Sequence, residues 1–434
     1  MNIIQKYTKQ NKLSHQAYQH AQKLLPSGNT RSALYWNPYP LTMTTGKASK
    51  ITDIDGNQRT DLNYNNTTLI LGHNHPKVIK AAKQQMQKGL VLGAPTETEP
   101  RLAEELLTRL KTERIRFTPT GTEANMQAIR VARTYTDKPL IAKCTGAYHG
   151  SWDAVPLNPG APGIPKGVEQ NTIYFPYNNP AEAEKTIKKH RNQLAAVIVE
   201  PTMRDMTPKP GFLETLRETT TEHDILLVFD EVISFRLSRG GAQEHYNVKP
   251  DITTMGKIIG GGFPVGAYAS TTETMTPLKI PATQLPETAS PRLGFSGTFN
   301  AFPIAMAAGL TVMKEMTKEK YTKIARLGEK MRKGLRKAFK EENLNIHVGG
   351  TGSLFNIAWT NQEVYDHQTS TTADRGLANI FNIGMMNKGY YILGHPNVST
   401  AQTRDEIKQA LTAARETTQE MKTTIQKRAP HLIT

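Results

Sequence analysis

The order of apolar and polar residues along the chain changes near residue 113. Before that point, residues 10–25, 75–90 and 98–112 show the apolar spacing of helices, and residues 31–58 alternate around an Asp-Gly turn as strands do. After it, short runs rich in Val, Ile and Leu, such as LAAVIVEP (194–201) and DILLVFDEVISF (224–235), separate helical segments. Because strands buried on both faces read as continuous apolar runs, this rhythm predicts a mainly parallel sheet covered by helices.

The last third of the chain returns to helices with a few short strands. Residues 303–341 form one long helical pattern, continuous or broken once, and a final helix is expected over 403–427. The stretches GSLFNIAW and GYYIL between them are expected to be strands. Four apolar residues repeat every fourth position and predict one buried helical face: Leu327, Met331, Leu335 and Phe339.

These patterns predict an α/β protein of two domains. A large domain is expected over residues 61–310. The N-terminal segment 1–60 and the C-terminal segment 311–434 are expected to build a smaller α+β domain together. A chain of 434 residues, 37% of them hydrophobic, is long enough for two such cores.

Composition and charge limit the setting of the protein. Cys144 is the single cysteine, which excludes a disulfide framework and fits a reducing cytoplasm. The N-terminus is polar, and no apolar run approaches the ~20 residues that a membrane span needs, so no membrane partner is expected. The net charge of +16 raises the remote alternative of a nucleic-acid-binding protein. No motif that reads a groove accompanies the charge, and a solvated basic helix face explains it, so no nucleic-acid partner is expected.

Two stretches place an acid and a lysine in unusual surroundings. Asp230 ends the apolar run ILLVFDE, and Lys257 stands in TTMGKIIGGGFPVG (253–266), where every other residue is apolar, hydroxylic or glycine. The pair resembles the Walker B acid and phosphate-loop lysine of an NTPase. That interpretation fails because Ile258, and not Ser or Thr, follows the lysine. By itself, Asp230 could simply end a strand.

Two further stretches supply a possible anion site and a possible stacking group. In TPTGTEANMQAIR (118–130), Gly121 and Thr122 begin a predicted helix, where backbone N–H groups can hold an anion, or Thr120 or Thr122 can simply cap the helix. In AYHGSWD (147–153), Tyr148 follows a short strand, where an aromatic ring either packs in the core or stacks on a flat ligand. Neither His149 nor the histidines of GHNHP (72–76) have further ligands at metal-binding spacing, so no metal is expected.

Together these four features describe a flat cofactor that carries a phosphate and an aldehyde, pyridoxal 5′-phosphate. The amine of Lys257 would form a Schiff base with the aldehyde, and Asp230 would keep the pyridine nitrogen protonated. The protonated ring would then stabilise negative charge on the substrate Cα, while the released lysine would carry the proton.

At this point the chain resembles a known family over nearly its whole length. It is similar to class III aminotransferases of the fold-type I pyridoxal-phosphate superfamily, in the subgroup of glutamate-1-semialdehyde aminomutases and β-amino acid aminotransferases. The resemblance is carried by GNTRSALYWNPYPLTM, ITDIDGNQRTDL, LGHNHPKVI, TGTEANMQAIRVAR, AYHG, VIVEP, FDEVISFR, PDITTMGKIIGGGFPVGAY and SGTFNAFPIAMAAG. It implies a seven-stranded, mostly parallel sheet between helices in the large domain.

The resemblance also implies roles for single residues. Lys257 would be the Schiff-base lysine and Asp230 the partner of the pyridine nitrogen, with Val232 and Tyr148 on the two ring faces. The phosphate would be held by three further residues: Gly121, Thr122 and, from the partner subunit, Thr298. Because Thr298 would act across a subunit boundary, the resemblance implies an obligate homodimer with shared active sites.

The subfamily decides the substrate. Arg31 of GNTRS matches an arginine that grips the substrate carboxylate in both subfamilies, a task suited to a planar guanidinium; the alternative is a surface arginine. Arg204 is either a second carboxylate clamp or a surface residue. The stretches GNTRSALYWNPYPLTM and RLSRGGAQ are closer to the β-amino acid aminotransferases, and YNNTT (64–68) stands where aminomutases tend to have a tryptophan.

The expected function is ping-pong amino transfer from a carboxylate-bearing amine, such as a β-amino acid, to a 2-oxo acid such as 2-oxoglutarate or pyruvate. The alternative is glutamate-1-semialdehyde aminomutase, or a related mutase or racemase on the same fold.

Overall fold

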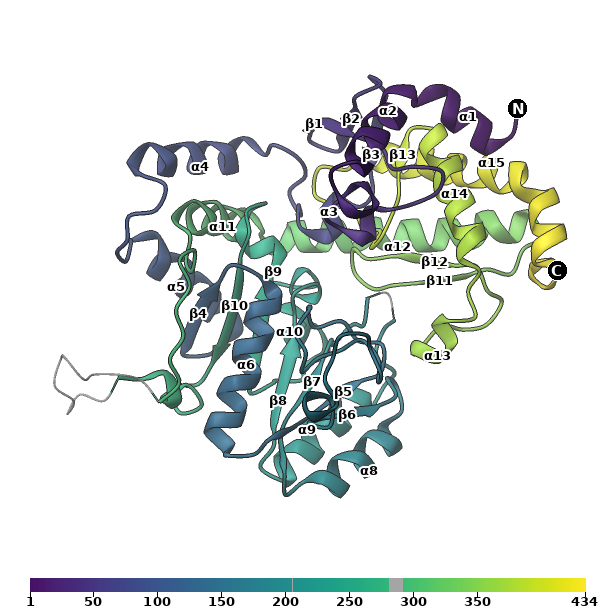
Figure 1. Ribbon diagram of the computed structural model, residues 1–434. Helices are drawn as coiled ribbons and strands as arrows, with labels where there is room; N and C mark the ends of the chain where they lie inside the picture. Colours follow the sequence, from purple (N-terminus) through teal and green to yellow (C-terminus); the bar gives the residue numbers. More distant parts are fainter. Residues whose placement is uncertain (205, 281–291) are drawn as a thin grey trace. The chain divides into compact units, whose positions relative to one another are not determined.

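The computed structural model describes residues 1–204, 206–280 and 292–434 (Figure 1). The chain divides into two compact units. Unit 1 comprises residues 1–75, 322–364 and 368–434, and unit 2 comprises residues 76–321 and 365–367. The domain limits at 60/61 and 310/311 stay a prediction.

Unit 2 is built on a seven-stranded sheet in the order β4-β10-β9-β8-β7-β5-β6. Its strands are β4 (Arg114–Thr118), β5 (Leu140–Cys144), β6 (Thr172–Phe175), β7 (Leu194–Val199), β8 (Leu226–Asp230), β9 (Ile252–Gly256) and β10 (Gly266–Ser270). Strand β10 is antiparallel to both of its neighbours, while β9, β8, β7, β5 and β6 run parallel. The predicted α/β fold with a mostly parallel sheet is confirmed.

Helices surround this sheet (Figure 1). The helices of unit 2 are α4 (Pro76–Lys88), α5 (Thr98–Leu110), α6 (Gly121–Thr136), α7 (Lys166–Glu169), α8 (Pro180–His190), α9 (Phe212–Glu222), α10 (Gly241–Tyr246) and α11 (Pro303–Glu315). Helix α6 packs on β10, β9, β8 and β7, and α11 packs between α4 and α5. Ala124, Ala128, Ile129 and Ala132 form the buried face of α6, and none of them is exposed.

Unit 1 joins the two ends of the chain in one sheet. Strands β1 (Met43–Lys47), β2 (Lys50–Asp53) and β3 (Gln58–Asp61) form an antiparallel meander, and β13 (Tyr390–Tyr391) pairs parallel with β3. A second sheet has two strands, β11 (His347–Gly349) and β12 (Asn356–Ala358). The helices are α1 (Ile3–Gln10), α2 (Lys12–Gln22), α3 (Tyr64–Thr67), α12 (Lys318–Glu341), α13 (His367–Ser370), α14 (Arg375–Asn387) and α15 (Arg404–Arg428); the first residues of α12 and α13 belong to unit 2.

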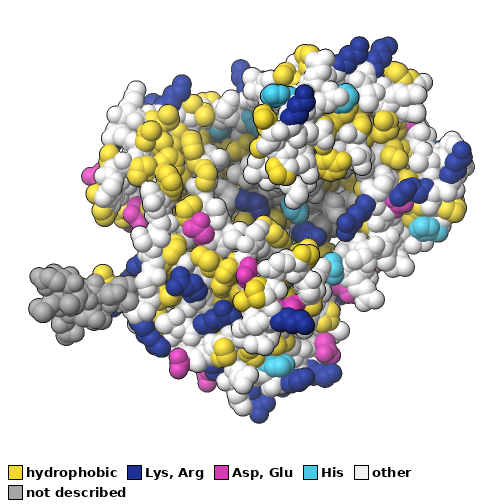
Figure 2. Space-filling model, viewed as in Figure 1, with side chains coloured by type: hydrophobic (Ala, Val, Ile, Leu, Met, Phe, Trp, Pro, Cys, Tyr) yellow, Lys and Arg dark blue, Asp and Glu magenta, His cyan; other side chains and the backbone are white. Residues whose placement is uncertain are grey.

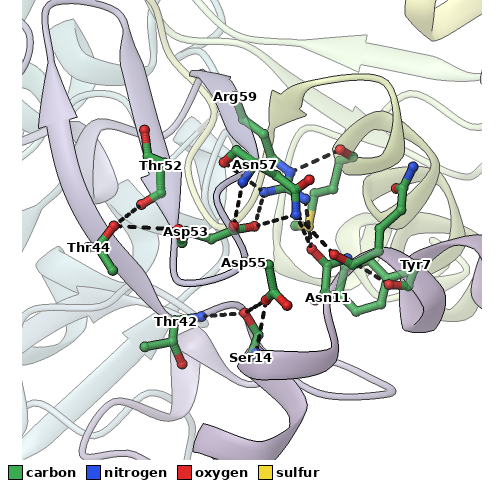
Figure 3. A network of polar contacts seen from close by, with 12 residues as sticks. Tyr7, Asn11, Ser14, Thr42, Thr44, Thr52, Asp53, Asp55, Asn57 and Arg59 are labelled. Atoms are coloured by element: carbon green, nitrogen blue, oxygen red, sulfur yellow. Dashed lines mark hydrogen bonds and ion pairs between the residues drawn. The ribbon is translucent and has the colours of Figure 1, made fainter.

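A buried polar network holds the N-terminal helices to this meander (Figure 3). Arg59 forms an ion pair with Asp53, and both side chains are almost fully buried. Arg59 also donates to Asn11 Oδ1 at 3.0 Å and to the Met386 carbonyl at 3.0 Å. Each buried charge therefore has a partner, as a low-dielectric interior requires.

The helix predicted over residues 10–25 is confirmed as α2 (Lys12–Gln22). A further helix that was not predicted, α1, precedes it, and the two are separated at Asn11. Asn11 leaves the helical conformation (φ −129°, ψ 48°), and its side chain donates to the Tyr7 carbonyl at 2.7 Å. That carbonyl would otherwise accept the main-chain N–H of the next turn, so the side chain replaces the helical bond.

Most other helix predictions are confirmed. The pattern over 303–341 is two helices, α11 and α12, and all four residues of the predicted buried face of α12 are buried. Helix α15 begins after a capping box between Thr403 and Glu406. Strands were expected throughout residues 31–58, but residues 31–42 form none. In the described part of the chain, no helix is long and apolar enough to cross a membrane.

Candidate active site

The carboxyl ends of four adjacent parallel strands place the candidate site in unit 2. Strand β5 ends just after Lys143, β7 is followed by Glu200, β8 ends at Asp230, and β9 is followed by Lys257. Because parallel strands end at the same edge of a sheet, these four side chains gather there. This is the edge at which open α/β sheets bind ligands.

Lys257 has the surroundings of a reactive amine. It follows β9 with a positive φ of 50°, a conformation that side chains rarely adopt and that is common at functional sites. Desolvation by the surrounding protein lowers the pKa of Lys257 from 10.5 to about 8, although the charges of Asp230 and Glu200 act in the opposite direction. A lowered pKa leaves more of the amine neutral and able to attack a carbonyl carbon.

Asp230 is held in place from three sides. Its Oδ2 atom lies 2.8 Å from His149 Nδ1 and accepts a hydrogen bond of 2.7 Å from Asn125 Nδ2, while Oδ1 accepts from the Val232 main chain at 3.1 Å. Thr254 Oγ1 donates to Asn125 Oδ1 and so fixes the orientation of that amide. The carboxylate is thus a fixed negative charge, only 4% exposed.

The turn before α6 has the features of an anion site. Thr120 caps the helix by accepting from the Glu123 main chain at 3.1 Å, which leaves the first two residues of the helix, Gly121 and Thr122, at its positive end. A Cβ atom on Gly121 would lie 2.9 Å from a methyl group of Val232. The expected helix cap is therefore made by Thr120 and not by Thr122, and the anion site at this turn stays a prediction.

Glycine contacts bring the predicted residues together. A Cβ atom on Gly150 would lie 2.5 Å from Thr122 Oγ1, so the loop that carries Tyr148 touches the start of α6. A Cβ atom on Gly256, directly before Lys257, would approach both Val232 and Gly121 within 4 Å. Gly150, Thr122, Gly121, Val232 and Gly256 are therefore packed close together, which brings the segments that carry Tyr148 and Lys257 to the start of α6.

Tyr148 and the acid behind it complete the site. Tyr148 is 57% exposed, so its side chain can be reached by a ligand. Its main-chain N–H donates to Glu200 Oε1 at 3.0 Å. Burial raises the pKa of Glu200, an effect that the charges of His149 and Arg204 oppose.

The remaining predicted residues have separate settings. Arg204 is half-buried with a φ of 61°, and its guanidinium donates to the Gly146 carbonyl at 2.6 Å. Arg31 belongs to unit 1, where it is exposed and donates to Asn65 Oδ1 at 2.7 Å. Thr298 is exposed in a turn of unit 2. The roles of these three residues stay predictions.

Sequence reasoning did not assign roles to His149, Asn125, Glu200 and Lys143. Asn125 lies one helical turn after Gly121, and Glu200 directly follows a strand, much as Asp230 ends one. Their positions in the sequence could therefore have predicted that both lie near the site. His149 was weighed only as a metal ligand, and its Nδ1 atom instead faces Asp230. Glu231, the second acid of the apparent Walker B segment, accepts from the main chain of Ala242 and Gln243 at the start of α10.

Comparison with known proteins decides the family. The model of the family "Aminotransferase class-III" matches residues 33–414. The chain belongs to the class III aminotransferases. This class III aminotransferase is 36% identical over 418 residues to a glutamate-1-semialdehyde 2,1-aminomutase of Methanosphaera stadtmanae, across 92% of this chain and 96% of that protein.

Solved structures agree with this assignment. An omega-transaminase from Sphaerobacter thermophilus is 36% identical with a TM-score of 0.88, across 94% of this chain and 98% of that one. A β-phenylalanine aminotransferase from Variovorax paradoxus is 29% identical with a TM-score of 0.88, across 97% of both chains. The protein therefore has the fold-type I architecture, and its cofactor is pyridoxal 5′-phosphate, which a similar solved transaminase holds.

The residues at the strand ends fit this cofactor. The Lys257 amine, with its lowered pKa, suits an aldehyde, and the fixed Asp230 carboxylate suits a pyridinium nitrogen. The start of α6 suits a phosphate. Gly121 and Gly150 allow a close approach to Val232 and Thr122 that a Cβ atom would prevent, so the start of α6, Val232 and the segment after Tyr148 lie close together. In the described residues, no group of three or more metal-ligating side chains is found.

Proposed function

We propose that this class III aminotransferase moves an amino group from a carboxylate-bearing amine, a β-amino acid, to a 2-oxo acid by a ping-pong cycle. The observation that carries the proposal is Lys257 with a pKa near 8 beside the fixed carboxylate of Asp230. When bound, pyridoxal phosphate supplies an electron sink for the substrate carbon that carries the amino group. The chain supplies the amine, the proton transfers and the binding geometry.

In this proposal the Lys257 amine would hold the cofactor, and the same amine would carry the proton at the substrate carbon. Asp230, oriented by His149 and Asn125, pairs with the pyridine nitrogen. Tyr148 and Val232 cover the two ring faces.

The remaining contacts serve the phosphate and the substrate. Gly121 and Thr122 bind the phosphate through the start of α6, and Thr298 of a second copy reaches the same phosphate. Arg31 binds the substrate carboxylate. Arg204 is the second candidate for binding that carboxylate. To do so, its guanidinium would exchange the hydrogen bond that it donates to the Gly146 carbonyl for one to the substrate.

The β-amino acid donor is supported by the β-phenylalanine aminotransferase among the similar structures and by YNNTT at 64–68. The second candidate is the aminomutase reaction on glutamate 1-semialdehyde, which is the activity named for the curated relative described above. The two reactions differ in whether an added oxo acid is needed.

One experiment separates them. The purified protein, loaded with cofactor, is incubated with glutamate 1-semialdehyde alone, and in parallel with β-phenylalanine plus 2-oxoglutarate or pyruvate. We expect amino-acid product only in the second mixture. Formation of 5-aminolevulinate from the semialdehyde without any oxo acid would overturn the transaminase proposal.

We further propose a homodimer, because unit 2 exposes an apolar segment. Four side chains on and after α4 are 43–57% exposed: Met86, Leu90, Val91 and Leu92. Figure 2 shows hydrophobic side chains gathered where Figure 1 places α4. Exposed apolar clusters of this kind are typical of contact surfaces between proteins.

A further inference from the structure

The loop that carries Tyr148 and His149 lacks secondary structure of its own. We call residues 145–156, which follow β5, the Tyr148 loop. Helix and strand are absent from this described segment, and a main-chain bond from Gly146 N to Leu157 O (3.0 Å) closes its base. A loop without a hydrogen-bonded ladder needs side chains to fix its path, because its polar backbone groups must still be satisfied.

Charged side chains bind the backbone of three successive loop residues. Arg204 donates to the Gly146 carbonyl at 2.6 Å, Lys143 donates to the Ala147 carbonyl at 2.9 Å, and Glu200 accepts from the Tyr148 main chain at 3.0 Å. Of these three groups, only Lys143 also reaches the far end of the loop. Its Nζ donates to the Pro156 carbonyl at 2.8 Å.

Lys143 is costly to bury and is nevertheless fully buried. It lies in β5 between β7 and β6, its side chain is 0% exposed, and its Nζ lies 5.5 Å from the centre of the Tyr174 ring. Desolvation lowers its pKa to about 8. A buried ammonium is tolerated where carbonyl oxygens and an aromatic face replace water, and here both carbonyls belong to the two ends of one loop.

We propose that Lys143 is a positioning residue for the cofactor site: its ammonium joins Ala147 to Pro156 and so fixes the loop that presents Tyr148 to the ring and His149 to Asp230. The inference rests on the proposed roles of Tyr148 and Asp230. Lys143 itself touches neither cofactor nor substrate in this account, and it acts through the loop.

The test compares Lys143→Met, which removes both hydrogen bonds at similar length, with Lys143→Gln, which keeps an N–H donor pair. Lys138→Met is the matched control, since half-buried Lys138 donates to the Arg191 carbonyl at 3.3 Å just before the same strand. Each variant is freed of cofactor and titrated with pyridoxal phosphate well below its melting temperature. The dissociation constant and the visible circular dichroism of the bound cofactor are recorded.

We expect Lys143→Met to weaken cofactor binding at least ~10-fold, the effect of losing one hydrogen bond from a charged donor. Its visible circular dichroism should fall, because the ring is held less firmly. Lys143→Gln should recover part of the cofactor affinity and part of the dichroism. Lys138→Met should have the affinity and dichroism of the parent protein. If Lys143→Met melts earlier but binds the cofactor with parental affinity and dichroism, Lys143 is only a stability residue and the inference is wrong.

Hydrogen exchange on the parent protein gives an answer even if neither variant folds. The amides of residues 146, 148 and 155 should exchange slowly before cofactor is added, because the joined loop is already ordered. Exchange at the rate of an unfolded chain would contradict the inference. A parent protein that binds no cofactor would instead overturn the proposed function.

Discussion

The electrostatics around Lys257 make a quantitative prediction about cofactor capture. Only the neutral amine attacks an aldehyde. With its pKa lowered to about 8, Lys257 is ~9% neutral at pH 7, against ~0.03% for a lysine with an ordinary pKa. At equal intrinsic reactivity, Lys257 should therefore capture pyridoxal phosphate roughly 300-fold faster at pH 7 than an exposed lysine would.

The assay mixes cofactor-free protein with pyridoxal phosphate in a stopped-flow instrument from about pH 6 to about pH 10. The capture rate should rise about tenfold per pH unit below the pKa of Lys257 and level off above it. A hydrazide, whose nitrogen stays neutral throughout, reacts in parallel and reports the titration of the cofactor itself.

Asp230→Asn perturbs this pKa in a known direction. The Asp230 carboxylate favours the ammonium form and raises the pKa of Lys257, while desolvation lowers it more strongly. Removing the charge should move the midpoint of the capture profile to lower pH. A parent midpoint near the ordinary lysine value, or an upward shift in Asp230→Asn, would refute the reasoning.

Three further substitutions test packing, a buried charge and the proposed interface. Gly309→Ala should lower the free energy of unfolding in urea by about 1–3 kcal/mol. The new Cβ atom would lie 1.9 Å from the main-chain oxygen of Ile259, two residues after Lys257. Gly167→Ala, with open space around it, should change little. Asp53→Ala should cost about 3–5 kcal/mol in the same assay, because it leaves the Arg59 charge buried and unpaired. Leu92→Glu should shift the protein from dimer to monomer in light scattering.

The controls for the last two predictions use exposed positions. Glu182→Gln breaks the exposed ion pair with Lys185 and should cost less than about 1 kcal/mol, so an equal loss in Asp53→Ala would contradict the importance of burial. Leu24→Glu replaces a side chain that is 70% exposed in unit 1 and should leave the dimer intact. A dimer that survives Leu92→Glu, or a monomeric parent, would remove the proposed interface.

The sheet and its strand ends could be predicted because their signals are local. Buried parallel strands appear as apolar runs, and Asp230 stands where such a run ends, while Lys257 follows the apolar and hydroxylic segment ITTMG. Helix α1 was missed although Asn2 and Gln5 form a capping box, since one apolar face of a short helix gives a weak periodic signal. The break at Asn11 accompanies its contact with Arg59, which lies 48 positions away in the sequence and which no local pattern contains.

The contacts that orient the site could not be predicted for the same reason. His149 meets Asp230 across 81 positions of sequence, and Asn125 meets it across 105. Lys143 reads as one polar residue in an apolar strand, and its two carbonyl partners become visible only when the loop after β5 is folded. Residue type and spacing identify reactive groups, while three-dimensional structure shows what holds them in place.

The most direct test of the central claim is to find which lysine carries the cofactor. The protein loaded with pyridoxal phosphate is reduced with borohydride, which fixes the cofactor to its lysine as a stable secondary amine, and the digested peptides are identified by mass. We predict a single adduct on Lys257, absent from a folded Lys257→Ala variant that also lacks turnover. An adduct on another lysine, or turnover in Lys257→Ala, would contradict the account.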